Sequence, residues 1–486
     1  MDTPHRSTWQ ALPGAGSITI AIPPNFVDYY RQLLETRLGR EWLEDTTSKG
    51  DPVRRMWRTQ AHSPFQRLRM CQIGRDIDYL REIGDDRQQG RLAALLQKVK
   101  DDPAQALDTL YELHVAMFFR PEQGGQGTLA PRDEQGYDVV VELMGDVANP
   151  MGGMWRLLGG RKLWVSCKRV NPSTASGEFA RRAQTVCKEL RASASAAGHR
   201  MYAGVVISRD ELPAHSTTLH ELWDSLCRTH APLSGTKTLT HGRYTALFGP
   251  HPAVQPSNLA SLRPGYALQV FGALSKQEYK RIEDIMQRAV DGLKMARDAN
   301  VIPNPSQTDA WVLAIDIPRW VSAATVAHLA AKQFAAGKFH DLSAVLLTRS
   351  LNAVSLSPPP TAVLTQEVYL VENARGSISL KTFLDDTHLQ PRVSGEYLEA
   401  PAVLIVPDSQ PPFASPEGYV YQEYGYQGAQ SWPTPPDILL PQLRVPYGYE
   451  AAPTLPVLDR MPAPRDAMPV SGHPADLPLV PAAVGQ

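Results

Sequence analysis

Residues 162–169 read Lys-Leu-Trp-Val-Ser-Cys-Lys-Arg, and the fold of the chain is best interpreted outward from this stretch. Its apolar and β-branched residues predict a buried strand that ends in two basic side chains. Upstream, residues 111–119 (YELHVAMFF) have the character of a helix, and residues 136–143 (GYDVVVEL) have that of a strand. Along the chain, these three segments supply a helix acid, a strand acid and a strand lysine: Glu112, Asp138 and Lys168.

These three side chains are expected to meet at one edge of a folded core. On a strand, alternate residues share a face, which aligns Asp138 with Glu142 and Lys168 with Ser166. Glu112 belongs to the apolar side of its helix. A carboxylate in that position is costly unless it is paired, protonated or bound to a cation. We therefore expect Glu112 to complete a cluster with Asp138 and Lys168.

The residue types in this cluster suit metal-assisted cleavage of a phosphodiester. A hard divalent cation such as Mg²⁺ prefers carboxylate oxygens and keeps several waters. The metal activates water and neutralises charge on the phosphate. A nearby lysine stabilises the developing negative charge. Basic residues around the strand are expected to hold the nucleic-acid backbone: Arg161, Lys162, Arg169, Arg181 and Arg182.

The phrase Val-Ser-Cys-Lys-Arg at 165–169 resembles Val-Glu-Cys-Lys-Arg of the PD-(D/E)xK, or restriction-endonuclease-like, nuclease superfamily. The resemblance covers roughly residues 105–208 and extends toward about 371. It implies that Glu112 is the helix acid, Asp138 the first metal ligand and Lys168 the catalytic lysine. It also implies Mg²⁺ or Mn²⁺ as cofactor, DNA rather than RNA as substrate, and a role in restriction, repair or anti-phage defence.

Ser166 departs from the pattern of this superfamily, which has an acidic residue or glutamine at that position. Three outcomes are open. The missing acid is supplied from elsewhere, with Glu142 on the Asp138 face, or Glu178 and Glu189 on the next helix, as candidates. Alternatively, the site binds metal weakly and acts only when a partner completes it. In the third case the site is inactive and the fold serves binding alone.

Further along the chain, helical and strand patterns alternate. Residues 174–197 predict a helix, and residues 201–208 (MYAGVVIS) a buried strand. The same succession returns as an amphipathic helix at 278–299 and a buried strand at 311–317. This is interpreted either as an internal repeat or as one continuous α/β sheet.

The chain divides into three parts by composition. Residues 1–104 are predicted to be mainly helical. Residues 105–400 are predicted to form a restriction-endonuclease-like α/β core, a mixed sheet flanked by helices, with an insertion at about 209–275. Residues 401–486 are rich in proline and poor in charge, which predicts an extended or disordered tail. Aromatic residues at 421–427 leave open a tail that docks on a protein partner.

The bulk composition sets limits on partners and location. The 486 residues carry a formal net charge of −1, so a nucleic-acid site must be a local basic patch. Four irregularly spaced cysteines argue against a disulfide framework. Without an apolar run of ~20 residues or a leader pattern, we expect a cytoplasmic protein that avoids membranes. One set of basic residues is interpreted as a solvated helical face, or alternatively as phosphate contacts: Arg54, Arg55, Arg58, Arg67 and Arg69.

Two other classes of function stay open beside the nuclease. One is a catalytically inactive nuclease-fold scaffold that binds nucleic acid or a protein partner. The other is a structural assembly protein whose tail lies over neighbouring copies, in keeping with an oligomer. An active nuclease requires a carboxylate at metal-ligand distance beside Asp138 and Lys168, whereas a pure binder lacks that acid but keeps the basic rim.

Overall fold

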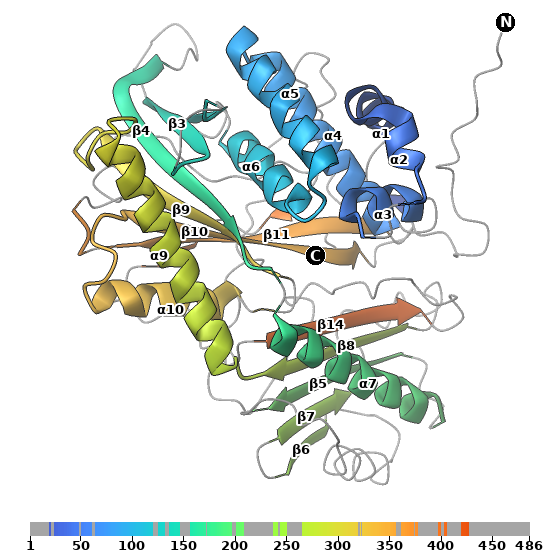
Figure 1. The fold of residues 1–486 in the computed structure, drawn as a ribbon. Coiled ribbons are helices and arrows are strands. Elements are labelled where there is room, and N and C mark those ends of the chain that lie inside the picture. The colour runs from blue at the N-terminus through green and yellow to red at the C-terminus, as the bar shows by residue number, and fades with distance from the viewer. Residues whose placement is uncertain are drawn as a thin grey trace, which may run out of the picture.

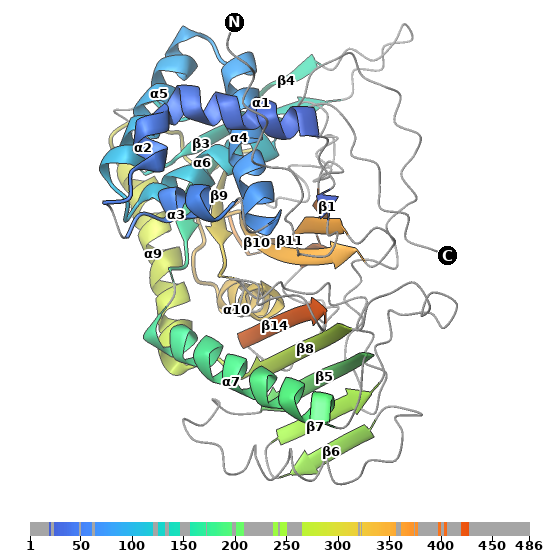
Figure 2. The same ribbon diagram turned by 90° about the vertical axis from the view of Figure 1, so that its right-hand side faces the viewer.

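A computed structural model shows two β-sheets joined by helices (Figures 1 and 2). The structure describes residues 19–20, 24–47, 50–60, 64–119, 125–131, 136–145, 156–171, 173–196, 201–208, 237–241, 244–249, 265–318, 321, 323–355, 361–373, 375–377, 397–399, 403–405 and 419–426.

The described residues of the N-terminal region are mainly helical. Asp51 caps one helix by accepting hydrogen bonds from the N–H groups of Val53 and Arg54, and Pro52 opens that helix. Asp85 caps another helix through the N–H of Gln88. The elements are β1 (Thr19–Ile20), α1 (Pro24–Leu34), a π-helix (Glu35–Gly39), α2 (Arg40–Glu44), α3 (Pro52–Thr59), α4 (Pro64–Ile83), α5 (Asp86–Asp101) and α6 (Ala106–Phe118).

Two of the N-terminal arginines lie in the helical interior. Arg54 is 7% exposed and forms ion pairs with Asp45 and Asp51. Arg67 is 6% exposed, and its burial lowers the pKa of its guanidinium. The interpretation of this set as a solvated face is therefore wrong for Arg54 and Arg67. Both belong to the packing between helices.

The larger sheet, sheet A, is mixed and has nine strands. Its main path runs β1-β11-β10-β9-β4-β3-β2, and β12 and β13 pair with β11. Neighbours from β2 to β4 are antiparallel, whereas β4, β9 and β10 are parallel. The strands are β2 (Gly125–Leu129), β3 (Val139–Gly145), β4 (Arg156–Arg169), β9 (Asp309–Asp316), β10 (Ala344–Ser355), β11 (Thr361–Glu372), β12 (Tyr397–Glu399) and β13 (Val403–Ile405).

Helices cover both faces of sheet A, which makes the fold α/β (Figure 1). α4, α5 and α6 pack on one face, and α9 (Lys276–Asp298) and α10 (Ala323–Ala335) pack on the other. β4 shows the expected alternation, because Val165 and Cys167 belong to the core on the α6 face whereas Trp164 packs into the core on the α9 face. The described residues of α6 are almost all buried, so this helix lies inside the molecule.

The smaller sheet, sheet B, has five strands in the order β14-β8-β5-β7-β6. α7 (Thr174–Ala196) packs against β8 and β14 (Figure 2). The strands of this sheet are β5 (Met201–Ser208), β6 (Lys237–His241), β7 (Tyr244–Gly249), β8 (Gly265–Gly272) and β14 (Tyr419–Tyr426).

Sheet B changes the interpretation of the middle of the chain. The strand β5 pairs with β7 and β8 and does not belong to sheet A, where β4 pairs directly with β9. The chain leaves sheet A after β4, and the segment that follows contains α7 and β5 in addition to the insertion expected at about 209–275. The interpretation as one continuous sheet is therefore ruled out for β5 and β9. The sequence did not reveal this, because a run of apolar residues specifies burial but not a pairing partner.

Two described segments of the tail that was predicted to be extended or disordered form paired strands. β13 pairs with β11, and β14 pairs along its whole length with β8. Tyr419 is 2% exposed and stacks on Phe179 of α7, with ring centroids 4.9 Å apart. Its hydroxyl lies 3.3 Å from the hydroxyl of Ser275, which caps α9. These strands dock on the same chain. Other parts of 401–486 fall outside the described residues.

A search of the described helices for a candidate membrane span found none that is long and apolar enough.

Candidate active site

The candidate site lies where α6 crosses the start of β3 and the end of β4. The backbone of Asp138 is fixed on both sides. Its N–H donates to the carbonyl of Val165 at 2.8 Å, and its carbonyl accepts from the N–H of Ala130 at 2.9 Å. Asp138 therefore stands at a defined point between β2 and β4 at the edge of the sheet.

The carboxylate of Asp138 contacts the end of β4 directly. Oδ2 accepts a hydrogen bond from the N–H of Cys167 at 2.6 Å, and Nζ of Lys168 lies 3.5 Å from the same oxygen. Nζ of Lys168 also donates to the carbonyl of Cys167 at 3.0 Å. The structure thus brings Asp138 and Lys168 together, and the backbone N–H orients the carboxylate.

Glu112 reaches this group from α6. Its side chain is nine-tenths buried, and its pKa is raised from 4.5 to about 7. Burial is the main cause, and the negative charge of Asp138 adds to it. Lys98, Arg91 and Lys168 oppose the shift. The two carboxyl groups are close enough to repel each other, and this is the situation that a divalent cation relieves.

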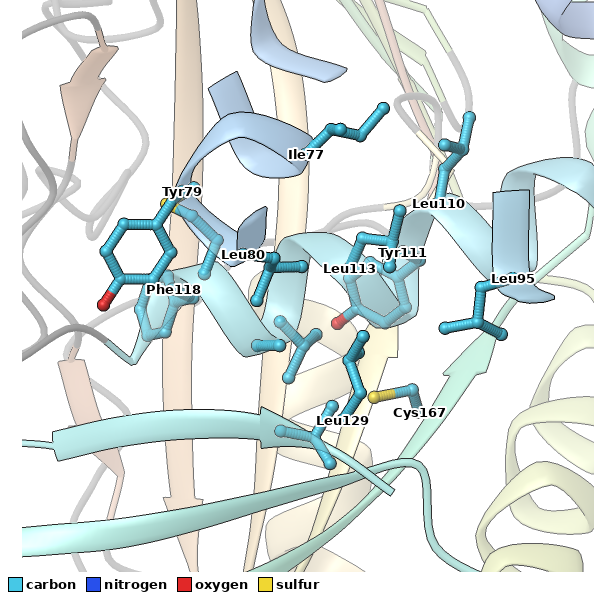
Figure 3. Packing of buried hydrophobic residues seen from close by; sticks show 14 of the residues in the cluster. Ile77, Tyr79, Leu80, Leu95, Leu110, Tyr111, Leu113, Phe118, Leu129 and Cys167 are labelled. Carbon is cyan, nitrogen blue, oxygen red and sulfur yellow. The ribbon is translucent and has the colours of Figure 1, made fainter. Parts of the chain in front are cut away.

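The alternation of β4 places Cys167, and not Ser166, on the α6 face. Cys167 belongs to the same core cluster as Tyr111 of α6, and Figure 3 shows its side chain on the side of β4 that faces this helix. Burial raises the pKa of the Cys167 thiol well above its usual value, and Asp138 and Glu112 raise it further, so the group is a neutral thiol. Ser166 is fully buried, and its hydroxyl has no hydrogen-bond partner among the described residues. Ser166 faces α9, away from Glu112.

A second charged group adjoins the first, and its helix acid, Asp108, was not predicted. Nε of Arg169 lies 2.6 Å from Oδ2 of Asp316 on β9, and its Nη1 lies 3.7 Å from Asp108 on α6. Burial raises the pKa of Asp108, whereas Arg169 lowers it and Asp316 raises it. Asp108 stands four residues before Glu112, so the helical spacing alone would have placed both acids on one face.

The structure does not bring Glu142 to this group. Glu142 lies four residues after Asp138 along β3, roughly 13 Å away for an extended strand. Its carboxylate forms an ion pair with Lys162 at 3.1 Å. The alternative acid Glu178 forms an ion pair with Arg182 on α7, the helix that packs against sheet B.

The five predicted nucleic-acid contacts do not form one patch. Arg161 and Lys162 lie about seven residues from Arg169 along β4, roughly 23 Å for an extended strand. Arg169 is held by two carboxylates. Arg181 and Arg182 belong to α7.

The donor set fits a small hard cation in part. Mg²⁺ is commonly held by one or two carboxylates plus waters and substrate phosphates. Glu112 and Asp138 can provide the two carboxylates. Within the described ranges, no three His, Cys, Asp or Glu side chains form a group able to hold a metal ion. Cys167 is a soft donor and does not replace a carboxylate for Mg²⁺.

Comparisons of the chain with models of protein families, with curated proteins and with solved structures found no match.

Proposed function

We propose that this chain is a metal-dependent nuclease that hydrolyses phosphodiester bonds, with DNA favoured over RNA. One observation carries the proposal: Glu112, Asp138 and Lys168, from three separate elements, converge at one edge of a mixed sheet. The restriction-endonuclease-like arrangement of the core is part of the same proposal. It is supported by the order of α6, β3 and β4 and by the position of Asp138 beside Lys168.

Each of the three residues has a distinct role in this proposal. Asp138 is held by the Cys167 N–H and presents an oriented carboxylate. Glu112, with a pKa of about 7, exchanges its proton near neutral pH and is the second carboxylate. Lys168 stabilises negative charge on the phosphate. A bound Mg²⁺ or Mn²⁺ supplies an activated water and neutralises charge.

A second candidate function is a nuclease fold that binds nucleic acid or a protein partner without cleavage. A specific observation favours it. Ser166 is turned to the α9 face, and the residue beside Glu112 and Asp138 is the neutral thiol of Cys167. The described residues thus offer two acids where a third would strengthen metal binding.

Plasmid cleavage separates the two candidates. Purified protein is incubated with supercoiled DNA, linear DNA and RNA in Mg²⁺ or Mn²⁺, beside Asp138→Asn and Lys168→Ala. Lys294→Ala is the matched control, because Lys294 lies on α9, on the opposite face of sheet A, and forms an ion pair with Asp341. We expect cleavage to fall by about 100-fold or more in both site variants and to persist in the control. A folded wild-type protein that cleaves nothing supports the binding function instead.

A further inference from the structure

The helix α5 presents one face to the candidate site. The side-chain amide of Gln88 forms two hydrogen bonds with the backbone of Leu129 on β2, each 2.9 Å long. The next residue, Ala130, donates to the carbonyl of Asp138 at 2.9 Å. The first turns of α5 are therefore fixed beside the strand segment that holds Asp138.

Positions three, seven and ten residues after Gln88 fall on the same face of α5. They are Arg91, Leu95 and Lys98. Leu95 is 1% exposed and packs in the core with Leu110 and Leu113 of α6 (Figure 3). Because Leu95 marks the seam between α5 and α6, Arg91 and Lys98 lie one turn on either side of it, at the border of the candidate site.

The charges of both residues reach the acids of α6 across this seam. Arg91 and Lys98 act on Glu112, and Lys98 also acts on Asp108. Lys98 is exposed, whereas Arg91 is half-buried. Among residues that the structure describes, neither side chain forms an ion pair. By contrast, most of the basic residues predicted from the sequence to contact nucleic acid form ion pairs: Lys162, Arg169 and Arg182.

We propose that Arg91 and Lys98 of α5 bind the phosphodiester backbone of duplex DNA and hold it across the site. Seven helical residues span roughly 10 Å. Each strand of duplex DNA carries one phosphate for about every 3.4 Å of helix axis, so two cations this close together can both reach one short stretch of a strand's backbone. The inference rests on the proposed function for the position of the scissile bond, but binding itself requires no cleavage.

Fluorescence anisotropy in EDTA tests this inference without catalysis. The probes are a fluorescein-labelled DNA duplex and a single-stranded RNA of equal length. The full chain is compared with Lys98→Ala, Arg91→Gln and the double variant. Lys100→Ala is the control, because Lys100 lies two residues on from Lys98, on a different face of α5. Circular dichroism verifies that each variant folds.

We expect each single variant to weaken duplex binding several-fold and to reduce the slope of log K against log salt by about 1. The double variant should lose about 2 from that slope, and the control should match wild type. Folded variants that bind duplex DNA as tightly as wild type would overturn the inference, as would a loss confined to RNA. Binding that depends on α5 in a protein that cleaves nothing supports the inference while refuting the nuclease proposal.

Discussion

Replacing Glu112 by glutamine should stabilise the metal-free protein at alkaline pH and leave its stability in acid almost unchanged. Glu112 is nine-tenths buried, and its pKa is raised from 4.5 to about 7 by burial and by Asp138. The native state therefore keeps a proton that the unfolded chain releases at lower pH. Stability falls as the pH rises from about 4.5 to about 7, and the loss is complete above that range.

The size of the effect follows from the same two values. The pKa of Glu112 rises from 4.5 to about 7 on folding, and each pKa unit is worth about 1.36 kcal/mol. Ionisation of Glu112 therefore lowers the free energy of unfolding by about 3 kcal/mol. Glutamine has nearly the shape of the protonated acid and cannot ionise. The variant should therefore match wild type at about pH 5 and exceed its free energy of unfolding by about 3 kcal/mol at about pH 8.5.

Urea denaturation in EDTA at these two pH values measures the difference. Glu142→Gln is the control, because Glu142 lies outside the site in an ion pair with Lys162. Added Mg²⁺ at the higher pH should stabilise wild type more than Glu112→Gln, since only wild type offers both carboxylates. If wild type and Glu112→Gln lose equal stability between the two pH values, the argument for a strained pair of carboxyl groups is refuted.

Three further positions test the surroundings of the site by thermal denaturation and proteolysis. Ser166→Glu should destabilise the fold by about 3 kcal/mol or more and restore no activity, because its side chain is buried on the α9 face without a partner. Ser166→Ala should be nearly neutral, since the hydroxyl makes no hydrogen bond within the part of the chain that the structure describes. Gly127→Ala should cost about 1–3 kcal/mol, because a Cβ there would lie 2.2 Å from the carbonyl oxygen of Ala116. Tyr419→Ala should cost about 3 kcal/mol and expose β14 to proteases, whereas Tyr419→Phe keeps the stack on Phe179.

Local patterns predicted several elements of this fold. Helical spacing located α9, and apolar runs located β5 and β9, because burial of one face leaves a period in the sequence. The pairing of strands left no such trace. β5 and β9 have the same apolar character, yet they belong to different sheets. Only contacts between residues distant in sequence decide that outcome.

The candidate site was likewise predictable only where its residues lie on elements close together in the sequence. Asp138 and Lys168 lie on neighbouring antiparallel strands, so a local argument was enough to pair them. Arg169 and Asp316 are separated by 147 residues and meet only because β4 pairs with β9. Cys167 lies on the face of sheet A that α6 covers. A strand sequence that is apolar on both faces does not specify which face that is.

On the proposed function, the charges around the site should make the binding of a divalent cation and the binding of DNA interdependent. In the free protein, Lys98 and Arg91 offset the negative charge of ionised Glu112 across the seam between α5 and α6. DNA phosphates that engage the two α5 cations would weaken that compensation and bring further negative charge to the site. A divalent cation then gains affinity, and linkage requires that it raise the affinity for DNA by the same factor. We expect anisotropy titrations to show tighter duplex binding in Ca²⁺ than in EDTA for wild type, and a smaller gain for Lys98→Ala. Equal gains in the two proteins would show that the α5 cations and the carboxyl pair act independently.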